Sequence, residues 1–296
     1  MSLPVHKIST DWKSMPAGLT YYFIGQPKSG KSTNSASWSE KGSDGVLLID
    51  TDLGGDFVDK ANVVFCTSLN PPYRKVMLDG IEVKDKKGNT KYEVIPNIER
   101  GLYHRSGDKK GQPCEAISLI EVFLELKNNW DSLPYDTIVI DTVDEVNKWI
   151  EDIVTDELGI DVMGQGQWGA DWGKARRKHL DIIKQFQNLI KQKGGNLIII
   201  SHSKQSAIND GKVQLSPDLP RGLGYALTAK ADVIGYTTGT KDSDDKWISF
   251  LSYDERTVGS RLKPLANKTL RFNYETIKEE ILNYNTKEKE KVNATV

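Results

Sequence analysis

The sequence predicts an α/β protein whose central sheet is mostly parallel and is flanked by helices. Short apolar segments recur along the chain and most end in polar or acidic residues, as buried strands of a parallel sheet do. They alternate with longer segments whose apolar residues recur at helical spacing. A glycine-bearing turn also follows the first apolar segment. The apolar segments are residues 19–24, 46–52, 62–67, 137–142 and 196–204, and the expected helices are residues 116–128, 143–158 and 175–193.

The turn after the first apolar segment has the pattern G-x-x-x-x-G-K-S. It is followed by residues 33–40, which contain neither glycine nor proline, so the local order is strand, loop, helix. This is the context in which backbone N–H groups of a phosphate-binding loop surround phosphate oxygens at a helix N-terminus. We therefore expect a nucleoside triphosphate to bind at Gly25, Gln26, Pro27, Lys28, Ser29, Gly30, Lys31, Ser32 and Thr33.

Two residues of this loop have predicted chemical roles. The Lys31 ammonium would reach the β- and γ-phosphates, and the Ser32 hydroxyl would ligate Mg²⁺. A second metal ligand is expected from residues 137–141, a charge-free apolar strand that ends in Asp141. The pattern of a later strand that delivers an Asp beside a phosphate loop is typical of magnesium-dependent nucleotide hydrolysis. Another apolar segment ends in Asp50 and Asp52, at the same edge of the expected sheet.

Composition limits the classes of protein that the chain can represent. Its 296 residues are 38% hydrophobic and 27% charged, which suits a globular α/β domain. No apolar run approaches membrane-spanning length, and the N-terminus lacks the apolar core of a secretion signal, so we expect a cytoplasmic protein without a membrane partner. Cys66 and Cys114 are the only cysteines, too few for a disulfide framework or a cysteine metal site.

The formal net charge is −1, so any binding of nucleic acid must come from local patches. Residues 174–193 contain seven basic residues and one acidic residue, which indicates either such a patch or a solvated helix face. The preceding glycine-rich residues 159–173 hold two tryptophans, which either pack in the core or a subunit contact, or stack on bases from a mobile loop. Candidate DNA-binding residues are Trp168, Trp172, Arg176, Arg177, Lys204, Lys212 and Arg221, the last two in an expected long loop over residues 206–224.

We expect one domain over residues 16–273, interrupted by a polar, turn-rich insertion at residues 70–113. Within the insertion, residues 81–84 are expected to pair with residues 92–95 as a hairpin. Short β-prone segments at residues 231–237, 247–253 and 270–273 would complete the sheet as antiparallel C-terminal strands. Residues 274–296 are expected to form a C-terminal helix and a charged tail.

With these motifs the chain resembles the RecA-type P-loop ATPase core over residues 16–272. More narrowly, it resembles the AAA-type, phage-encoded RecA-core recombination ATPases associated with single-strand annealing. The resemblance rests on G-Q-P-K-S-G-K-S, V-L-L-I-D-T-D, T-I-V-I-D-T-V-D, I-I-I-S-H-S-K and K-A-D-V-I-G-Y, and on the tryptophan-bearing stretch of residues 166–173. It implies ATP and Mg²⁺ as cofactors, single-stranded DNA as partner, a homo-oligomeric ring or filament, and a phage-infected or prophage-bearing bacterial host.

The resemblance also implies residue roles. The water-activating acid matches Asp52, one methylene shorter than the Glu found in RecA, so Asp144 and Glu145 remain alternatives. His202 matches the polar residue that senses the γ-phosphate and couples hydrolysis to a DNA-binding loop. A neighbouring subunit would donate a cation to the γ-phosphate, for which Arg256, Arg261 and Lys263 match in region only.

Two other functions remain open from sequence. A P-loop kinase would need a lid with several arginines, and the insertion offers only Arg74, Arg100 and Arg105. An ATP-switched assembly or helicase-loading factor would bind nucleotide without needing rapid turnover, which the shorter acid at Asp52 permits.

Overall fold

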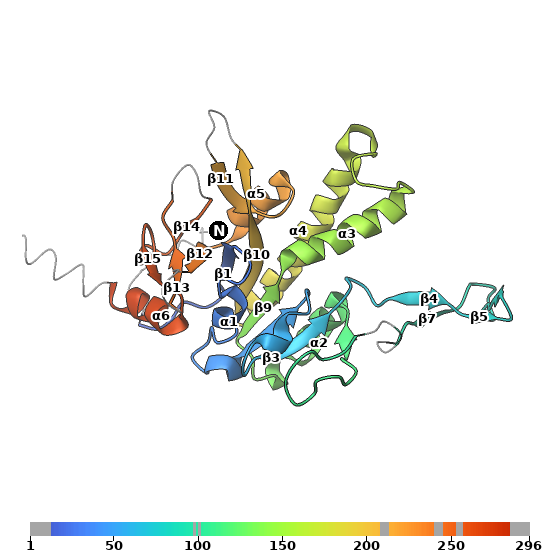
Figure 1. Cartoon of the computed structure of the whole chain (residues 1–296), viewed down its shortest axis with the longest axis horizontal. Helices are drawn as coiled ribbons and strands as arrows, with labels where there is room; N and C mark the ends of the chain where they lie inside the picture. The colour runs from blue at the N-terminus through green and yellow to red at the C-terminus, as the bar shows by residue number, and fades with distance from the viewer. Residues whose placement is uncertain are drawn as a thin grey trace, which may run out of the picture.

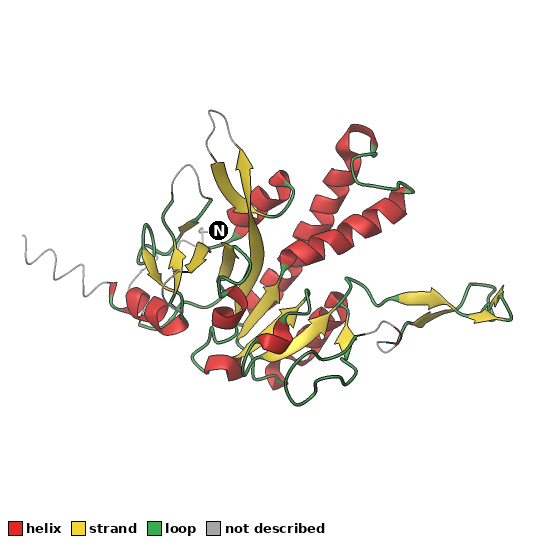
Figure 2. Cartoon of the chain, in the orientation of Figure 1, coloured by secondary structure: helices red, strands yellow, loops and turns green. Residues whose placement is uncertain are grey.

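The computed structural model describes residues 13–96, 99, 102–207, 213–239, 245–252 and 257–284. Strands and helices alternate over most of the described chain (Figures 1 and 2). The strands are β1 (Thr20–Gly25), β2 (Val46–Asp50), β3 (Asn62–Cys66), β4 (Tyr73–Lys75), β5 (Met77–Leu78), β6 (Ile81–Glu82), β7 (Tyr92–Val94), β8 (Ala116–Ile117), β9 (Thr137–Asp141), β10 (Asn196–Ala207), β11 (Val213–Pro217), β12 (Val233–Gly239), β13 (Lys246–Ser249), β14 (Gly259–Ser260) and β15 (Thr269–Arg271). The α-helices are α1 (Lys31–Ser35), α2 (Leu119–Asn129), α3 (Val143–Leu158), α4 (Ala170–Gln192), α5 (Arg221–Lys230) and α6 (Tyr274–Leu282).

An eleven-stranded sheet forms the centre of the fold, in the order β15-β13-β12-β1-β10-β9-β2-β3-β8, with β11 beside β10 and β14 beside β12. The strands from β12 to β8 along this order are parallel, whereas β11, β13, β14 and β15 pair antiparallel with their neighbours. The predicted fold class is therefore confirmed. Because the carboxyl ends of β1, β2, β9 and β10 meet at one edge, polar residues that follow these strands are brought together there.

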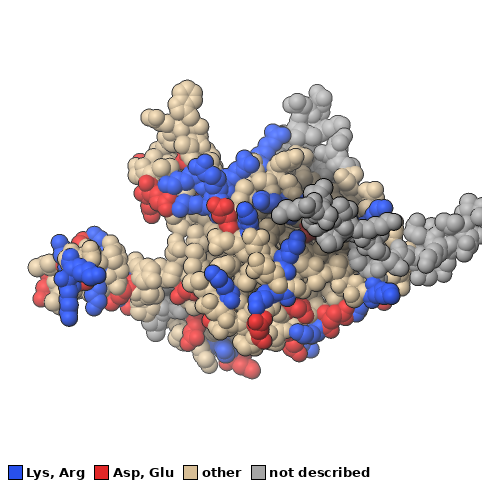
Figure 3. Space-filling model, turned by 180° about the vertical axis from the view of Figure 1, so that it is seen from behind, with Lys and Arg blue, Asp and Glu red and all other residues tan. Residues whose placement is uncertain are grey.

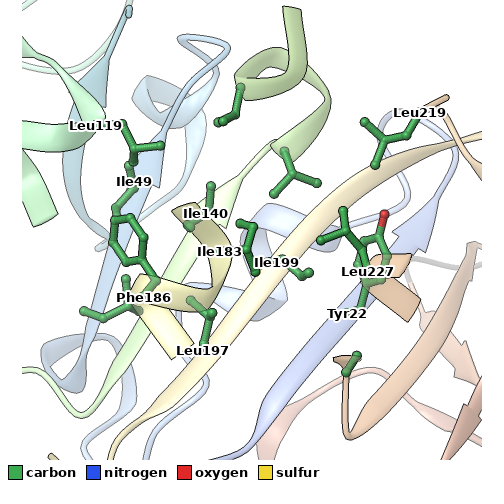
Figure 4. Close-up of a cluster of buried hydrophobic side chains, with 14 of the residues drawn as sticks. Tyr22, Ile49, Leu119, Ile140, Ile183, Phe186, Leu197, Ile199, Leu219 and Leu227 are labelled. Atoms are coloured by element: carbon green, nitrogen blue, oxygen red, sulfur yellow. The ribbon is translucent and has the colours of Figure 1, made fainter. Parts of the chain in front are cut away.

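Both faces of the sheet are covered, which explains the uninterrupted apolar runs of the parallel strands. On one face, side chains such as Ile140 and Ile199 pack against α2, α3, α4 and α5, with Phe186 of α4 among them (Figure 4). On the other face, Phe23 packs against Trp38 and Phe272, with ring centroids 5.0 and 5.1 Å away. Alternate residues of β1 thus enter different cores, and both cores fix the strand that leads into the phosphate loop.

Some expected elements have different bounds. The helix after the phosphate loop, expected over residues 33–40, is the five-residue α1. Helix α4 begins at Ala170, before the expected residue 175, so Trp172 is helical rather than part of a loop. The expected loop over residues 206–224 was also wrong: β10 continues into a hairpin with β11, and α5 follows. Pairing with β10 forms this hairpin, and the sequence of the second strand alone does not reveal that partner.

The strands β4 to β7 of the insertion form an arm that stands away from the sheet (Figure 2), whereas Leu102 and His104, later in the insertion, pack back against Phe65 of β3. The predicted pairing of residues 81–84 with 92–95 was wrong: β7 pairs with β4, and β6 pairs with β5. The reason is the two-residue turn at Asp79 and Gly80, whose φ angles of 52° and 81° suit a tight hairpin. This turn closes a shorter loop than the expected one.

A buried histidine in α4 makes the folded chain sensitive to acid. His179 is fully buried, neither ring nitrogen has a hydrogen-bond partner among the described residues, and burial lowers its pKa to about 3. The unfolded chain therefore takes up a proton below about pH 6.5 that the folded chain excludes, so stability falls as pH drops through that value.

We expect this histidine to cost about 2 kcal/mol of unfolding free energy between pH 7 and pH 5. Urea unfolding of the wild type and of His179→Leu at both pH values tests this, because the leucine variant should lose less stability on acidification. An equal loss in the two proteins would contradict the assignment.

Candidate nucleotide-binding site

The phosphate loop leaves β1 at Gly25 and enters α1 at Lys31. Gly30 has a φ of 83°, a left-handed conformation that favours glycine. A Cβ atom on Gly25 would lie 2.1 Å from the Thr237 hydroxyl oxygen of β12, so only glycine fits there. The hydroxyls of Ser29 and Thr237 are 2.6 Å apart, which ties the loop to the neighbouring strand. The loop is thus held from both ends before any ligand binds.

Lys31 lies inside the loop with only 5% of its surface exposed. Its ammonium donates hydrogen bonds to the carbonyl oxygens of Gly25 and Gln26, at 3.0 and 2.9 Å. Burial lowers the pKa of Lys31, and the nearby carboxylates of Asp141 and Asp144 act in the opposite direction. A buried cation held by loop carbonyls is positioned to exchange them for phosphate oxygens.

The loop meets the end of β9 at Ser32 and Asp141. Burial raises the pKa of Asp141 to about 6, and a hydrogen bond from Ser32 opposes that rise. A hydroxyl next to one carboxylate fits Mg²⁺, which binds few protein ligands and keeps several waters. The described residues hold no group of three or more His, Cys, Asp and Glu side chains that would suit a closed metal cage. Ser32 and Asp141 are therefore the residues that could hold the ion.

Asp50 organises the loop that follows β2. Its carboxylate, 1% exposed, accepts hydrogen bonds from the backbone N–H groups of Asp52 (3.2 Å), Gly54 (3.2 Å) and Gly55 (2.6 Å). It pairs in register with Asp141 across β2 and β9. Burial raises the pKa of Asp50 to about 7. The carboxylate thus fixes the backbone that presents Asp52.

Asp52 is exposed and faces a cleft of about 600 Å³ beside the end of β9. One Asp52 oxygen accepts from the N–H of Gly54 at 3.0 Å. The two alternative acids, Asp144 and Glu145, line the same cleft, and Glu145 is paired with Lys148 at 2.7 Å. All three candidates for orienting water therefore lie in one cleft.

His202 lies within β10, where the parallel pairing with β1 ends opposite Gly25, and it also lines this cleft. Asp144 accepts hydrogen bonds from the His202 backbone N–H at 2.6 Å and contacts its Nδ1 at 2.9 Å. The predicted sensor residue is thus brought to the acids and to the strand end at Asp141.

A family model described as an AAA domain matches residues 17–262 of this sequence. The chain belongs to this family. It is accordingly an AAA-type P-loop ATPase, a domain that binds and hydrolyses ATP. A search of the curated proteins found no match to the sequence.

The candidate DNA-binding residues of this AAA domain fall into two groups. Trp172 and Lys204 line the cleft that also holds Asp52 and His202, and Arg176 and Arg221 line adjoining hollows around α5. Trp168, fully exposed with a φ of 55°, lies instead at the far end of the α3–α4 hairpin, and Arg177 is exposed on α4. Lys212 lies outside the described residues.

The candidate trans-acting cations lie elsewhere in the AAA domain. Arg261 pairs with Asp232 at 2.9 Å, at the start of β12, whereas the phosphate loop meets the end of that strand at Thr237. Within one chain Arg261 therefore lies at the opposite edge of the sheet from Gly25. Lys263 is exposed nearby, and Arg256 lies outside the described residues. Their action in trans stays a prediction.

Sequence reasoning missed two contacts of the phosphate loop in this AAA domain. One is Thr237, described above. The other is Lys246 of β13, whose Cγ lies 2.9 Å from the position that a Cβ on Gly30 would take. The remaining loop candidates Gln26, Pro27 and Lys28 line a crevice of about 420 Å³ that ends at Gly239, and Thr33 is exposed on α1. Because more than 200 residues separate Lys246 from the loop, no local pattern in the sequence indicates this contact.

No helix among the described residues combines the length and apolar character needed to cross a bilayer.

Proposed function

We propose that this AAA domain is a Mg²⁺-dependent ATPase that acts on single-stranded DNA in phage-type recombination or annealing. The observation that carries the proposal is the single cleft that runs from Asp52 and His202, beside the phosphate loop, to Trp172 and Lys204. In the free protein Lys204 donates to the Leu219 carbonyl at 2.6 Å and lies 3.5 Å from Asp218, so a nucleic-acid phosphate would replace these contacts. A strand held there and stacked on Trp172 would border the residues that face the γ-phosphate. Bound nucleotide and bound DNA would then contact residues that line the same cleft.

At the nucleotide, the proposed roles follow from the contacts. Lys31 would bind the β- and γ-phosphates, Ser32 and Asp141 would hold Mg²⁺, and Asp52 would orient the attacking water. Magnesium would supply charge neutralisation at the phosphates. The supporting facts are the burial of Lys31 in the loop and the hydrogen bond between Ser32 and Asp141.

At the DNA, the supporting charge lies on α4. Lys and Arg side chains gather on the helical projection formed by α3 and α4, beside a smaller acidic group (Figure 3). Part of this charge is neutralised, because Lys174 and Lys178 both pair with Glu157 at 2.8 Å. Arg176 and Arg177 are exposed and are the side chains on which the proposal relies for phosphate contacts. The patch is therefore smaller than the seven basic residues of the sequence indicated.

Contacts in the insertion disfavour the kinase alternative. Arg74 pairs with Glu93 at 2.7 Å and also with Glu99, and the Arg105 guanidinium lies 5.2 Å from the Phe57 ring centroid. Arginines engaged in this way are less available to close over a phosphoryl acceptor.

Filter binding of labelled single-stranded DNA tests the DNA part of the proposal. The double variant Arg176→Ala/Arg177→Ala should bind about tenfold more weakly at low salt, and its slope of log affinity against log salt should be smaller by about 1.4, because each phosphate contact contributes about 0.7 for single strands. Arg271→Ala is the matched control, since Arg271 pairs with Asp245 on the C-terminal strands.

Absence of wild-type affinity at low salt, with and without ATP, would overturn the DNA assignment. The Arg271→Ala control removes one charge where the double variant removes two, so a fall in its log affinity of about half the size would show that the effect is one of total charge.

A further inference from the structure

Asp144 occupies the first turn of α3, three residues after the end of β9, and is 9% exposed. Its carboxylate bridges two elements, because all of its hydrogen-bond donors come from β10. The His202 backbone N–H donates to Oδ2 at 2.6 Å, and the Ser201 hydroxyl donates to Oδ1. His202 Nδ1 is 2.9 Å from Oδ2. A carboxylate in this position holds the imidazole as well as the strand.

These contacts determine the tautomer of His202. Oδ2 of Asp144 already accepts the backbone N–H of His202, so it serves as an acceptor toward Nδ1 as well. Nδ1 therefore carries the proton, and in the neutral ring Nε2 is left with an unshared electron pair. A neutral imidazole in this state accepts a hydrogen bond at Nε2 and does not donate one to a phosphate oxygen.

The rest of His202 is also fixed. Its backbone carbonyl accepts a hydrogen bond from the N–H of Asp218 at 2.8 Å, and the side chain keeps 32% of its surface exposed. The ring lines the cleft that also contains Asp52 and Thr142. Since Nδ1 is engaged by Asp144, Nε2 is the polar atom of the ring that is available to the cleft.

We propose that Asp144 and His202 act as a carboxylate–imidazole pair in which His202 Nε2 accepts the proton of the attacking water. This rests on the proposed hydrolysis of ATP at this site. The water oxygen forms a bond to the γ-phosphorus, and the bond from that phosphorus to the bridging oxygen breaks, so ADP leaves with the electron pair. The water proton passes to Nε2 and afterwards to phosphate or solvent. Asp144 is a positioning residue that fixes the ring and stabilises the imidazolium.

This role differs from the γ-phosphate contact that the family resemblance implies for His202, because a phosphate sensor must donate from Nε2. Asp52 then orients the same water by accepting its second proton in a hydrogen bond, and the two residues share the cleft rather than compete.

Two measurements test the pair. In single-turnover assays, Asp144→Asn and His202→Asn should each lower the hydrolysis rate about 100-fold while the ATP dissociation constant changes less than about threefold. The double variant should be no slower than either single variant, because the residues act as a unit. Nitrogen-15 NMR of the imidazole should show the Nδ1–H tautomer in the wild type and a shift toward Nε2–H in Asp144→Ala. Asp156→Asn, an exposed carboxylate on the same helix, is the control.

Multiplicative losses in the double variant, an Nε2–H tautomer in the wild type, or a loss of ATP binding in Asp144→Asn would each overturn the pair. Failure of the pair is distinct from failure of the proposed function. If Lys31→Ala stops turnover while Asp144→Asn does not slow it, the proposed ATPase function is supported and the proposed Asp144–His202 pair is refuted. If the wild type hydrolyses no ATP, both proposals are refuted.

Discussion

Lys31→Ala is expected to lower ATP turnover at least about 100-fold and to leave the fold intact. Among the described residues of the phosphate loop, Lys31 is the buried charged side chain. Removing one preorganised donor to developing negative charge typically lowers kcat by a factor of about 100 to 1,000. Its hydrogen bonds in the free protein go to the carbonyls of Gly25 and Gln26, so alanine removes no hydrogen bond of another side chain, and it takes away one cation near the buried Asp141. Steady-state release of phosphate measures the effect, and circular dichroism and thermal unfolding report the fold.

The matched control is Lys127→Ala, because Lys127 is exposed on α2. It should retain wild-type turnover. Turnover that persists in Lys31→Ala would refute the site, and a collapsed far-ultraviolet spectrum in that variant would instead show that the loop carbonyls need the ammonium to fold.

The phosphate loop could be predicted from sequence because its chemistry is local. Gly25, Gly30, Lys31 and Ser32 lie within eight residues, and the backbone that they require is set by the flanking strand and helix. The position of Asp141 could also be predicted from sequence, because a charge-free apolar run that ends in an acid is typical of the end of a buried parallel strand. The edge at which they meet then follows from parallel strands alone.

The links between distant segments could not be predicted. The Asp144–His202 contact joins residues 58 positions apart, and it forms because β10 lies beside β9 in the sheet. Lys246 reaches Gly30 only because β13 pairs with β12, which in turn pairs with β1, the strand that leads into the phosphate loop. The expected hairpin was wrong for a related reason: β4 pairs with β7 around an inner pair of β5 and β6, and the tight turn at Asp79 and Gly80 sets that nested arrangement. The stability of a strand pair depends on side-chain contacts with neighbouring strands, and the order of residues along the sequence does not identify those strands.

Asp50 affects the proposed reaction indirectly, because its buried carboxylate holds the backbone that carries Asp52. We therefore expect Asp50→Ala to lower ATP turnover about 100-fold while nucleotide binding persists. Alanine leaves the N–H groups of Asp52 and Gly55 without their acceptor, so the backbone that carries Asp52 moves. A displacement of about 1 Å in a positioning group is enough for a loss of this size. The unsatisfied N–H groups should also cost roughly 1–3 kcal/mol of unfolding free energy. Turnover and nucleotide affinity measured side by side check the prediction, and Asp59→Ala, an exposed carboxylate of the same segment, is the control.

The pH dependence of Asp50 separates its electrostatic role from its structural one. Burial raises its pKa to about 7, above the value in the unfolded chain, so the folded protein gains a proton as pH falls from about 7 toward 4. That uptake stabilises the fold at lower pH, and a charged Asp50 destabilises it above pH 7. Asp50→Asn cannot take up the proton. The unfolding free energy of the wild type relative to Asp50→Asn should therefore rise between pH 8 and pH 5, by on the order of 1 kcal/mol per pH unit below 7. A difference that stays flat would mean that Asp50 remains ionised in the folded chain, held by the three N–H donors more strongly than burial opposes it.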